Sequence, residues 1–350
     1  MPLEEPAPAS LRIAVVGCGD ISAQHFAAIE TIDGATLAAV VDVDPGRRDA
    51  AAAAHGVPGH ASLGELLAQG GIDVVHVCTP HDAHAPLARE ALAAGVHVLT
   101  EKPVAHTLAD AEALAVAARE AFRGPGTQLG VCFQNRYNTP VRALQELLAR
   151  GGLGRIVGAT ATVMWHRTPD YYAARPWRGT WAGSGGGLLM NQAIHTLDLL
   201  EWLVGPARVV GGAASTRALA GAIEVEDTAD ILLEHTTADG GTLRSVFFAT
   251  NANAVNSPVT LDITTERAEL SLRGALTVRH GDGRVDIVHE EGILPGERSY
   301  WGASHRLLIE DFYASIGSDR PFWIGAEEAC APLRIIKDVY ARTYAPGEWV

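Results

Sequence analysis

The chain has few charged residues, few aromatic residues and no long hydrophobic run. Of its 350 residues, 19% are charged and 6% are aromatic, and the formal net charge at pH 7 is −14. A net negative charge provides no general attraction for nucleic acid or for an anionic membrane. No apolar run reaches the roughly 18 residues that a membrane span requires. We therefore expect neither a nucleic-acid partner nor a membrane partner.

Cysteine is also scarce. The four cysteines are widely separated in the chain: Cys18, Cys78, Cys132 and Cys330. Three of them lie at or beside predicted strands, so we expect buried thiols in a reducing compartment rather than disulfides. The histidines include neither an HExxH motif nor a cysteine-paired zinc spacing, and we predict no metal site.

The first ten residues lack both the basic start and the apolar centre of an export signal. Residues 1–10, MPLEEPAPAS, are acidic and rich in proline. We therefore expect a disordered leader and a cytoplasmic protein.

The pattern of apolar residues changes near the middle of the chain, which is long enough for two domains. Up to residue 137, short apolar segments alternate with helical ones, which is typical of a doubly wound parallel sheet. From residue 138, strand segments predominate. We predict an α/β protein with an N-terminal Rossmann domain over residues 11–137. The second domain, residues 138–350, is predicted to be α+β with a large, mostly antiparallel open sheet, and its last helix is a candidate to pack back on the first domain.

A dinucleotide-binding fingerprint opens the first domain. The strand Leu11–Val16 is followed by a turn containing Gly17 and Gly19 and then by a helical pattern. Gly17 permits the tight turn, and Gly19 lets backbone N–H groups approach a pyrophosphate at the helix N-terminus. Asp20 and Ile21 complete the predicted phosphate-binding turn. Ser22 stands where the strict motif has a third glycine.

The second strand, residues 36–41, ends at Asp42. A carboxylate at this position accepts hydrogen bonds from the adenosine ribose and repels a 2′-phosphate, so we expect NAD as the cofactor. Arg47 and Arg48 lie just beyond and leave NADP as an alternative.

Two further apolar strands, residues 73–78 and 96–100, each end in polar residues. The carboxyl edge of a parallel sheet is where such sheets bind ligands. We therefore expect the following residues to line the cofactor site: Cys78, Thr79, Pro80, His84, Glu101 and Lys102.

In the second half we predict a long helix over residues 187–203 and two late helices over residues 304–316 and 326–340. The predicted strands are residues 156–165, 208–216, 228–235, 242–250, 259–265, 268–272 and 285–289.

These motifs together resemble the glucose–fructose oxidoreductase/inositol dehydrogenase family (Gfo/Idh/MocA). The resemblance extends from Arg12 to about Tyr344. It is carried by the Gly17/Gly19 turn, Cys78-Thr79-Pro80 with His84, Glu101-Lys102-Pro103, Gln134-Asn135-Arg136, and Gly185-Gly186-Gly187 followed by His195-Thr196-Leu197-Asp198. The resemblance implies NAD(P)-dependent oxidation or reduction of a sugar, a polyol or a related cyclic hydroxy compound. It also implies that the open sheet mediates a homodimer or homotetramer.

Lys102 and His195 are the predicted acid/base residues. Removing a hydroxyl proton as hydride leaves requires a group whose pKa is near 7; histidine suits this, and a lysine can be shifted down by burial or by a neighbouring cation. Asn191 and Asp198 lie four residues before and three residues after His195, so we expect the three to share one helix face. The family usually carries an aspartate where Asn191 stands. An amide can orient a hydroxyl but cannot act as the base.

Several polar and aromatic residues are candidates for substrate contact. Those we select are Asn135, Arg136, His166, Arg167, Tyr172, Asn191 and Asp198, with Tyr171 and Arg178 nearby in the sequence. Packing between the domains is an equal alternative for the aromatic and arginine residues, and Asp198 could instead anchor its helix. The glycine run 183–187 is expected to allow close approach of the backbone to substrate.

The leading hypothesis is a dehydrogenase that transfers hydride between a carbohydrate hydroxyl and NAD. One alternative retains NAD and uses transient oxidation to eliminate or hydrolyse a glycosidic bond. Another is a non-catalytic NAD-binding protein, which would need neither Lys102 nor His195.

Overall fold

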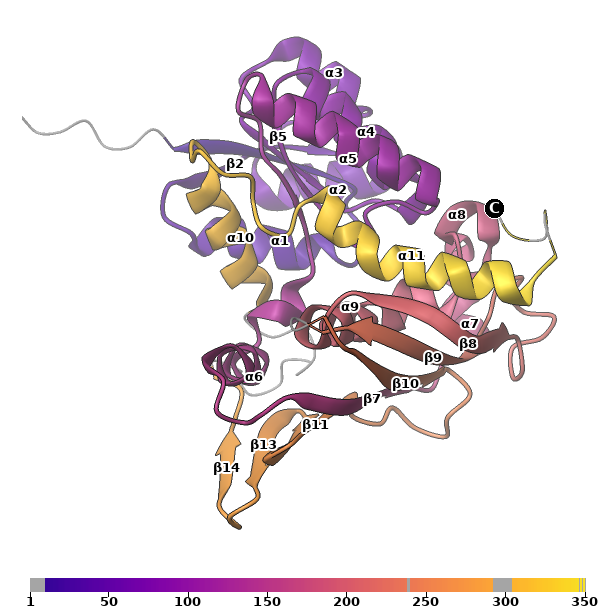
Figure 1. The fold of residues 1–350 in the computed structure, drawn as a ribbon. Helices are drawn as coiled ribbons and strands as arrows, with labels where there is room; N and C mark the ends of the chain where they lie inside the picture. The colour runs from indigo at the N-terminus through magenta and orange to yellow at the C-terminus, as the bar shows by residue number, and fades with distance from the viewer. Residues whose placement is uncertain (1–9, 238–239, 292–303, 346, 348, 350) are drawn as a thin grey trace, which may run out of the picture.

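The computed structural model describes residues 10–237, 240–291 and 304–345, together with residues 347 and 349. The predicted leader lies outside the described residues except for Ser10. An upper domain built on a parallel sheet sits above a second, larger sheet, and the long helix α11 runs between them (Figure 1).

The first domain contains a parallel sheet with the strand order β3-β2-β1-β4-β5-β6. Its strands are β1 Leu11–Val16, β2 Ala35–Val41, β3 Gly59–His60, β4 Val74–Val77, β5 His97–Thr100 and β6 Leu129–Val131. All four residues of β4 are buried, as expected for a strand with helices on both faces. Strands β2 and β3 lie on one side of β1, and β4, β5 and β6 lie on the other. Ligands bind beyond the carboxyl ends of the strands at the point where the strand order reverses in this way, between β1 and β4.

Helices cover both faces of this sheet. They are α1 Ser22–Thr31, α2 Pro45–His55, α3 Leu63–Gln69, α4 His81–Ala93 and α5 Leu108–Arg123. Side chains cap the N-termini of α2, α3 and α5. The side chain of Ser62 accepts a hydrogen bond from the Glu65 backbone N–H at the start of α3, which satisfies one exposed donor of the helix. The sequence pattern predicts the next helix over residues 85–94, and α4 begins four residues earlier, at His81.

The second domain contains an eight-stranded sheet with the order β14-β13-β12-β11-β7-β10-β9-β8. Its strands are β7 Ile156–Met164, β8 Ala207–Ser215, β9 Thr228–Thr236, β10 Thr242–Thr250, β11 Thr260–Thr265, β12 Ala268–Arg273, β13 Ala275–His280 and β14 Val285–Val288. Only β7 and β10 pair in parallel, which confirms the mostly antiparallel prediction. Strand β13 was not predicted, because the single residue Gly274, with φ +77°, turns the chain directly from β12 into β13.

The predicted helix over residues 187–203 consists of a π-helical segment followed by an α-helix. Residues Leu189–Ala193 form a π-helical segment, η3, and α9 follows over Ile194–Val204. The remaining helical segments of this half are η1 Gln134–Tyr137, α6 Thr139–Arg150, α7 Pro169–Ala173, η2 Pro176–Gly179, α8 Trp181–Ser184, α10 Ser304–Ser315 and α11 Ala326–Thr343. Among the described residues, no helix is both long and apolar enough to cross a bilayer.

The end of the chain returns to the first domain. Helix α10 packs on α1 and η1, and the Val131 N–H of β6 donates to the Ile324 carbonyl at 2.9 Å. Helix α11 then contacts α5 on one side and β8 on the other (Figure 1). Residues 304–324 therefore pack on the Rossmann domain, although the sequence pattern assigned them to the second domain.

Candidate active site

A cavity of about 1270 Å³ lies at the carboxyl edge of the parallel sheet and is lined by both domains. The first domain contributes the predicted residues Gly19, Asp20, Ile21, Cys78, Thr79, Pro80, His84, Glu101 and Lys102. The second domain contributes Trp165, Arg167, Tyr171, Trp177, Arg178, Asn191 and His195. The fold thus brings most of the predicted cofactor residues to one face of the cavity.

The cavity carries an unusual number of buried polar atoms without partners. Five such atoms, unpaired among the described residues, belong to residues that line it: Thr79 Oγ1, Gln134 Oε1, Arg167 Nε, His195 Nδ1 and His305 Nδ1. Buried polar groups in folded proteins are normally hydrogen-bonded, so unpaired ones need a reason. Their concentration here indicates that the cavity is built for a polar ligand.

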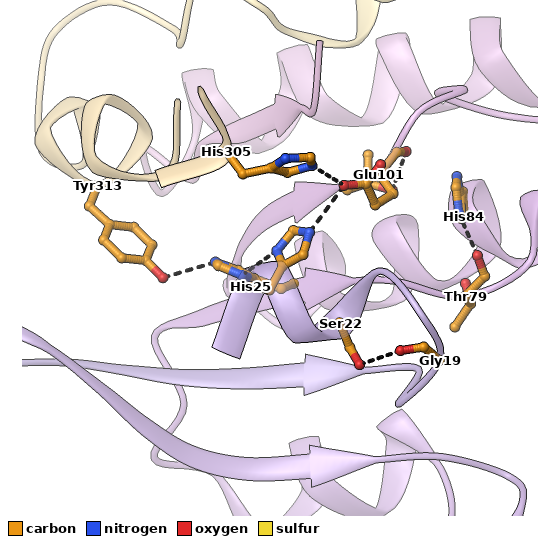
Figure 2. A network of polar contacts seen from close by, with 10 residues as sticks. Gly19, Ser22, His25, Thr79, His84, Glu101, His305 and Tyr313 are labelled. Carbon is orange, nitrogen blue, oxygen red and sulfur yellow. Dashed lines mark hydrogen bonds and ion pairs between the residues drawn. The ribbon is translucent and has the colours of Figure 1, made fainter. Parts of the chain in front are cut away.

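The glycine turn fits a dinucleotide. A side chain at Gly17, whose φ is +92°, would lie 2.7 Å from the backbone of Cys78, so this position is dictated by packing against the end of β4. A side chain at Gly19 would meet nothing within 4 Å, and this open space allows a phosphate to approach the backbone. The hydroxyl of Ser22 donates to the Gly19 carbonyl at 2.7 Å and braces the turn (Figure 2).

Asp42 is held beside this turn but does not line the cavity. Its carboxylate accepts hydrogen bonds from the backbone N–H groups of Cys18 and Asp44, both at 2.8 Å. Each oxygen of a carboxylate has a second lone pair, so these contacts orient Asp42 and leave it able to accept another donor. Arg47, the basic residue that leaves NADP open, does line the cavity.

Lys102 and His195 come from different domains and meet at this cavity. Lys102 follows β5, and its Nζ donates to the Asn191 carbonyl at 2.8 Å. Burial lowers the pKa of Lys102 to about 8. Burial, and then the nearby charge of Lys102, hold the pKa of His195 well below its usual value, so His195 is a neutral imidazole.

The helix that carries Asn191 and His195 is held by a buried carboxylate that the sequence patterns did not single out. Glu226 accepts hydrogen bonds at 2.8 Å from the backbone N–H groups of Gly187 and Leu189 and from the Tyr340 hydroxyl. These contacts satisfy donors at the start of the helical segment and tie it to α11. The sequence signal that could have revealed this residue is the pair Glu226-Asp227 directly before the apolar strand β9.

The glycine run 183–187 contacts protein instead of substrate. A side chain at Gly187 would lie 2.0 Å from the Glu226 carbonyl oxygen, and one at Gly186 would lie 2.2 Å from the Tyr340 hydroxyl. The Gly185 carbonyl accepts a hydrogen bond from Lys337 Nζ at 2.7 Å. The expected close approach is therefore real, but it is made to α11 and to the segment before β9.

An alternating row of aromatic rings and arginines forms part of the cavity wall that the second domain contributes. The Arg167 guanidinium lies 5.0 Å from the centre of the Trp165 ring and 5.1 Å from that of Tyr171. On the other side of Tyr171, the Arg178 guanidinium lies 4.7 Å away and 5.7 Å from Trp177. We call Trp165, Arg167, Tyr171, Arg178 and Trp177 the arginine wall.

The arginine wall is linked to the first domain through Asp20. Its carboxylate accepts hydrogen bonds from Arg175 at 2.8 Å and from Arg178 at 3.2 Å. The side chain of Asp20 is 51% exposed, and exposed ion pairs contribute little to stability. The contact therefore joins the two domains at the cavity without strongly fixing them.

Arg136 and Asp198, which were candidates for substrate contact, form a buried ion pair, and neither residue lines the cavity. Arg136 is fully buried and donates to Asp198 at 2.6 and 2.9 Å and to Glu328 at 2.8 Å. Asp198 therefore does not share the cavity-facing side of the helix with Asn191 and His195. The ion pair joins η1 to α9, and the contact with Glu328 adds α11. Asp198 therefore anchors its helix, which was the alternative to substrate contact.

The other substrate candidates divide between the cavity and its surroundings. Asn135, Arg167 and Asn191 line the cavity. Tyr172 is buried beneath it, and its hydroxyl accepts a hydrogen bond from Asn251 at 3.0 Å. His166 is exposed outside it, with Nδ1 2.8 Å from the Asn253 carbonyl. Packing therefore accounts for Tyr172 and His166 without substrate.

Glu101 is the centre of a buried polar cluster that the sequence patterns did not reveal. Its Oε1 lies 3.1 Å from His25 Nε2 and 3.3 Å from His305 Nε2 (Figure 2). His25 Nδ1 lies 2.9 Å from His76 Nδ1, and His76 Nε2 lies 2.9 Å from the Tyr313 hydroxyl. The atoms of His25, Glu101 and His305 could also hold a metal by distance, but a hydrogen bond accounts for each of them. We call these five residues the Glu101 chain.

Two family models match the chain. Residues 11–123 match a model described as "Oxidoreductase family, NAD-binding Rossmann fold", and residues 141–271 match the "GFO/IDH/MocA C-terminal domain". A putative UDP-kanosamine synthase oxidoreductase subunit from Amycolatopsis mediterranei is 31% identical over 89% of this chain and 97% of its own length. An inositol 2-dehydrogenase from Leifsonia xyli is 36% identical over 56% of this chain, and the match spans about half, 54%, of that enzyme.

Similarity to a solved structure supports the same family assignment. The WlbA dehydrogenase from Bordetella pertussis, in complex with NADH and UDP-GlcNAcA, superposes with a TM-score of 0.81 and 30% identity, covering 96% of each chain. The similarity spans both domains and therefore the cavity between them. The chain belongs to the GFO/IDH/MocA family of NAD-binding oxidoreductases.

Proposed function

We propose that the protein is an NAD-dependent dehydrogenase that transfers hydride between the cofactor and a hydroxyl-bearing carbon of a sugar, a polyol or a related cyclic compound. The observation that carries the proposal is the convergence of Lys102 and His195 from different domains on one cavity beside the glycine turn. The names of the relatives, which include inositol and UDP-sugar oxidoreductases, support the same reaction class.

The chain's own residues would manage the proton. NAD, held by the glycine turn and by Cys78, Thr79, Pro80 and His84, supplies the hydride acceptor when bound. Lys102, with a pKa of about 8, is partly deprotonated just above neutral pH, so Nζ can take the hydroxyl proton. His195 is neutral, and its unpaired Nδ1 can accept or donate a hydrogen bond depending on its tautomer. The side-chain amide of Asn191 has no acid/base chemistry, and its backbone carbonyl accepts the hydrogen bond from Lys102 Nζ.

Asp42 supports NAD over NADP. It stands at the end of β2 with its carboxylate oriented by Cys18 and Asp44, where a 2′-phosphate would meet negative charge. Arg47 at the cavity is the feature that would favour NADP. Side-by-side kinetics with the two cofactors decide between them.

The arginine wall supports a substrate that carries a negative charge. Arg167 and Arg178 line the cavity of a protein whose formal net charge is −14, and Arg167 Nε has no partner among the described residues. Guanidinium groups bind carboxylates and phosphates with paired hydrogen bonds. The structural relative bound to UDP-GlcNAcA carries such groups on its ligand. We infer a sugar acid or a nucleotide-linked sugar.

The test is a substrate panel with neutral polyols, sugar acids and nucleotide-linked sugars, each with NAD and with NADP. Growth of NADH absorbance with one class supports the proposal, and loss of this signal in Lys102→Met with NADH still bound assigns the proton step. Products released without net NADH, from a protein that retains NAD through gel filtration, would favour transient oxidation. Tight NAD binding with no reaction across the panel would favour a non-catalytic role.

The open face of the second sheet supports the expected homo-oligomer. Val246 on β10 and Val285 and Ile287 on β14 are each more than half exposed, at 51%, 51% and 56%. The strand register places Val246 and Ile287 in one row across the outer face. Light scattering after gel filtration measures whether two or four copies associate.

A further inference from the structure

His305 reaches the cavity from a part of the chain remote from every motif. It lies in the second position of α10, which packs on the Rossmann domain, and its residue is only 2% exposed. Its Nε2 is 3.3 Å from Glu101 Oε1, while its Nδ1 has no partner among the described residues. His305 also lines the cavity that holds Lys102 and His195.

Donor and acceptor requirements assign the protons of the Glu101 chain. The Glu101 carboxylate only accepts, so His25 Nε2 and His305 Nε2 must each carry a hydrogen. A neutral His25 that donates through Nε2 must accept at Nδ1, so His76 donates through its own Nδ1. The Nε2 of a neutral His76 then accepts, so the Tyr313 hydroxyl donates to it. Every hydrogen bond of the Glu101 chain is therefore donated in the direction of Glu101. Figure 2 shows these contacts as dashed lines.

The opposite direction would require a cationic His25. If His25 donated from both nitrogens, it would carry a positive charge in a fully buried position. Burial lowers the pKa of His25 and holds that of His76 well below its usual value. The hydrogen bonds to Glu101 outweigh the effect of its burial and hold its pKa well below the usual value. His25 and His76 are thus neutral imidazoles beside the Glu101 carboxylate.

We propose that His305 is a further ligand-binding residue of this site, whose tautomer the Glu101 chain fixes so that Nδ1 accepts a hydrogen bond from the occupant of the cavity. A neutral imidazole that donates through Nε2 has its lone pair on Nδ1. Glu101 thus has two roles: its backbone positions Lys102, and its carboxylate orients His305. The inference rests on the proposed function for the identity of the occupant.

The occupant must offer a hydrogen-bond donor at this point. Under the proposed function there are two sources, the carboxamide N–H of the nicotinamide and a hydroxyl of the substrate. Both offer a neutral donor that matches a neutral acceptor. Loss of one such bond in a water-excluded site is expected to weaken binding or turnover about tenfold.

The experiment compares three variants of the full-length protein at pH 8, where an ordinary imidazole is neutral. His305→Leu removes both hydrogen bonds. In His305→Asn the amide oxygen can take the place of Nδ1, whereas in His305→Gln the amide nitrogen can take the place of Nε2 and keep the bond to Glu101. We expect His305→Leu to lose about tenfold in NADH affinity or in kcat/KM. His305→Asn should retain most of the wild-type value, and His305→Gln should lose nearly as much as His305→Leu. Circular dichroism and thermal unfolding confirm that each variant is folded, and the Asn and Gln pair remains informative if Leu does not fold.

A cofactor analogue separates the two sources. Reduced 3-acetylpyridine adenine dinucleotide has a methyl group in place of the amide nitrogen. If the carboxamide is the donor, the preference of the wild-type protein for NADH over this analogue shrinks in His305→Leu. If a substrate hydroxyl is the donor, both cofactor affinities stay unchanged and kcat/KM falls.

Three results would overturn the inference. One is a His305→Leu variant with unchanged NADH affinity and unchanged kcat/KM. Another is rescue by Gln equal to rescue by Asn, because this would mean that His305 only supports Glu101. The third is a stoichiometric metal in the purified protein that is lost in His305→Leu. If no compound of the panel reacts, the proposed function fails and the nicotinamide carboxamide is the only donor left of the two. Unchanged NADH affinity in His305→Leu then overturns this inference separately.

Discussion

The two walls of the cavity are built in different ways. The Rossmann wall consists of turns at the ends of neighbouring strands of the sheet, with a backbone cradle at Gly19 and a lysine two residues after β5. The arginine wall consists of long side chains from the short helices α7 and η2 and from the segment after β7, stacked on one another and partly exposed. This difference suggests that the first wall serves a constant ligand and the second a variable one, because short connecting segments change without altering the scaffold.

The largest expected effect separates two buried lysines. Burial lowers the pKa of both Lys102 and Lys337 to about 8, but only Lys102 lines the main cavity, while Lys337 holds the Gly185 carbonyl. We expect Lys102→Met to lower kcat by roughly 10²- to 10⁴-fold with NADH affinity kept. Lys337→Met should lower the melting temperature and change kcat far less. Equal loss of kcat in both folded variants would contradict the distinction.

A second contrast concerns two ion pairs. Arg136 and Asp198 are fully buried, so Arg136→Met leaves a carboxylate without its partner and should cost about 3–5 kcal/mol of unfolding free energy. Arg175 pairs with the exposed Asp20, and Arg175→Met should cost only about 0–1 kcal/mol. Urea unfolding followed by circular dichroism measures both. Similar losses would show that the Asp20 contact holds the domains together more firmly than its exposure indicates.

The arginine wall can be tested through substrate charge. Arg167→Met removes a guanidinium from the wall while its neighbours Trp165 and Tyr171 stay. We expect KM for an anionic substrate to rise roughly tenfold to hundredfold and KM for a neutral polyol to change little. An equal rise for both substrates would assign Arg167 to general packing.

The smallest expected effect is a shift in pH dependence. Under the proposed mechanism Lys102 must be neutral to take the hydroxyl proton, so kcat/KM for alcohol oxidation should rise with pH through about 8. Burial lowers this pKa, whereas the negative charge of Glu101 raises it, so Glu101→Gln should move the midpoint to lower pH. A full pH profile of both proteins checks the direction. A midpoint that moves upward would mean that Glu101 does not act on Lys102 through its charge.

Much of the Rossmann half could be predicted, because its signals are local. A strand, a glycine turn and a helix occupy consecutive residues, and the polar residues at the ends of β4 and β5 fall on one edge of a parallel sheet by geometry alone. The capping residue Ser62 is a local signal of the same kind, since a serine three residues before a glutamate is the form of a capping box, and its side chain accepts from the Glu65 N–H.

Long-range contacts could not be predicted in this way. Nothing near Arg136 in the sequence indicates that Asp198 and Glu328 neutralise it, and the glycines at 185–187 read equally well as a flexible loop until Tyr340 and Glu226 fill the space around them. His305 is 204 residues from Glu101.

The sequence by itself determined the cofactor fold, the two-domain plan and the lysine at the end of β5, because these depend on residue spacing within one strand–turn–helix unit. Only the tertiary structure decided which polar residues outside the Rossmann turns face the cavity and which are neutralised in the core. That choice depends on burial, and burial is settled by elements hundreds of residues apart coming into contact.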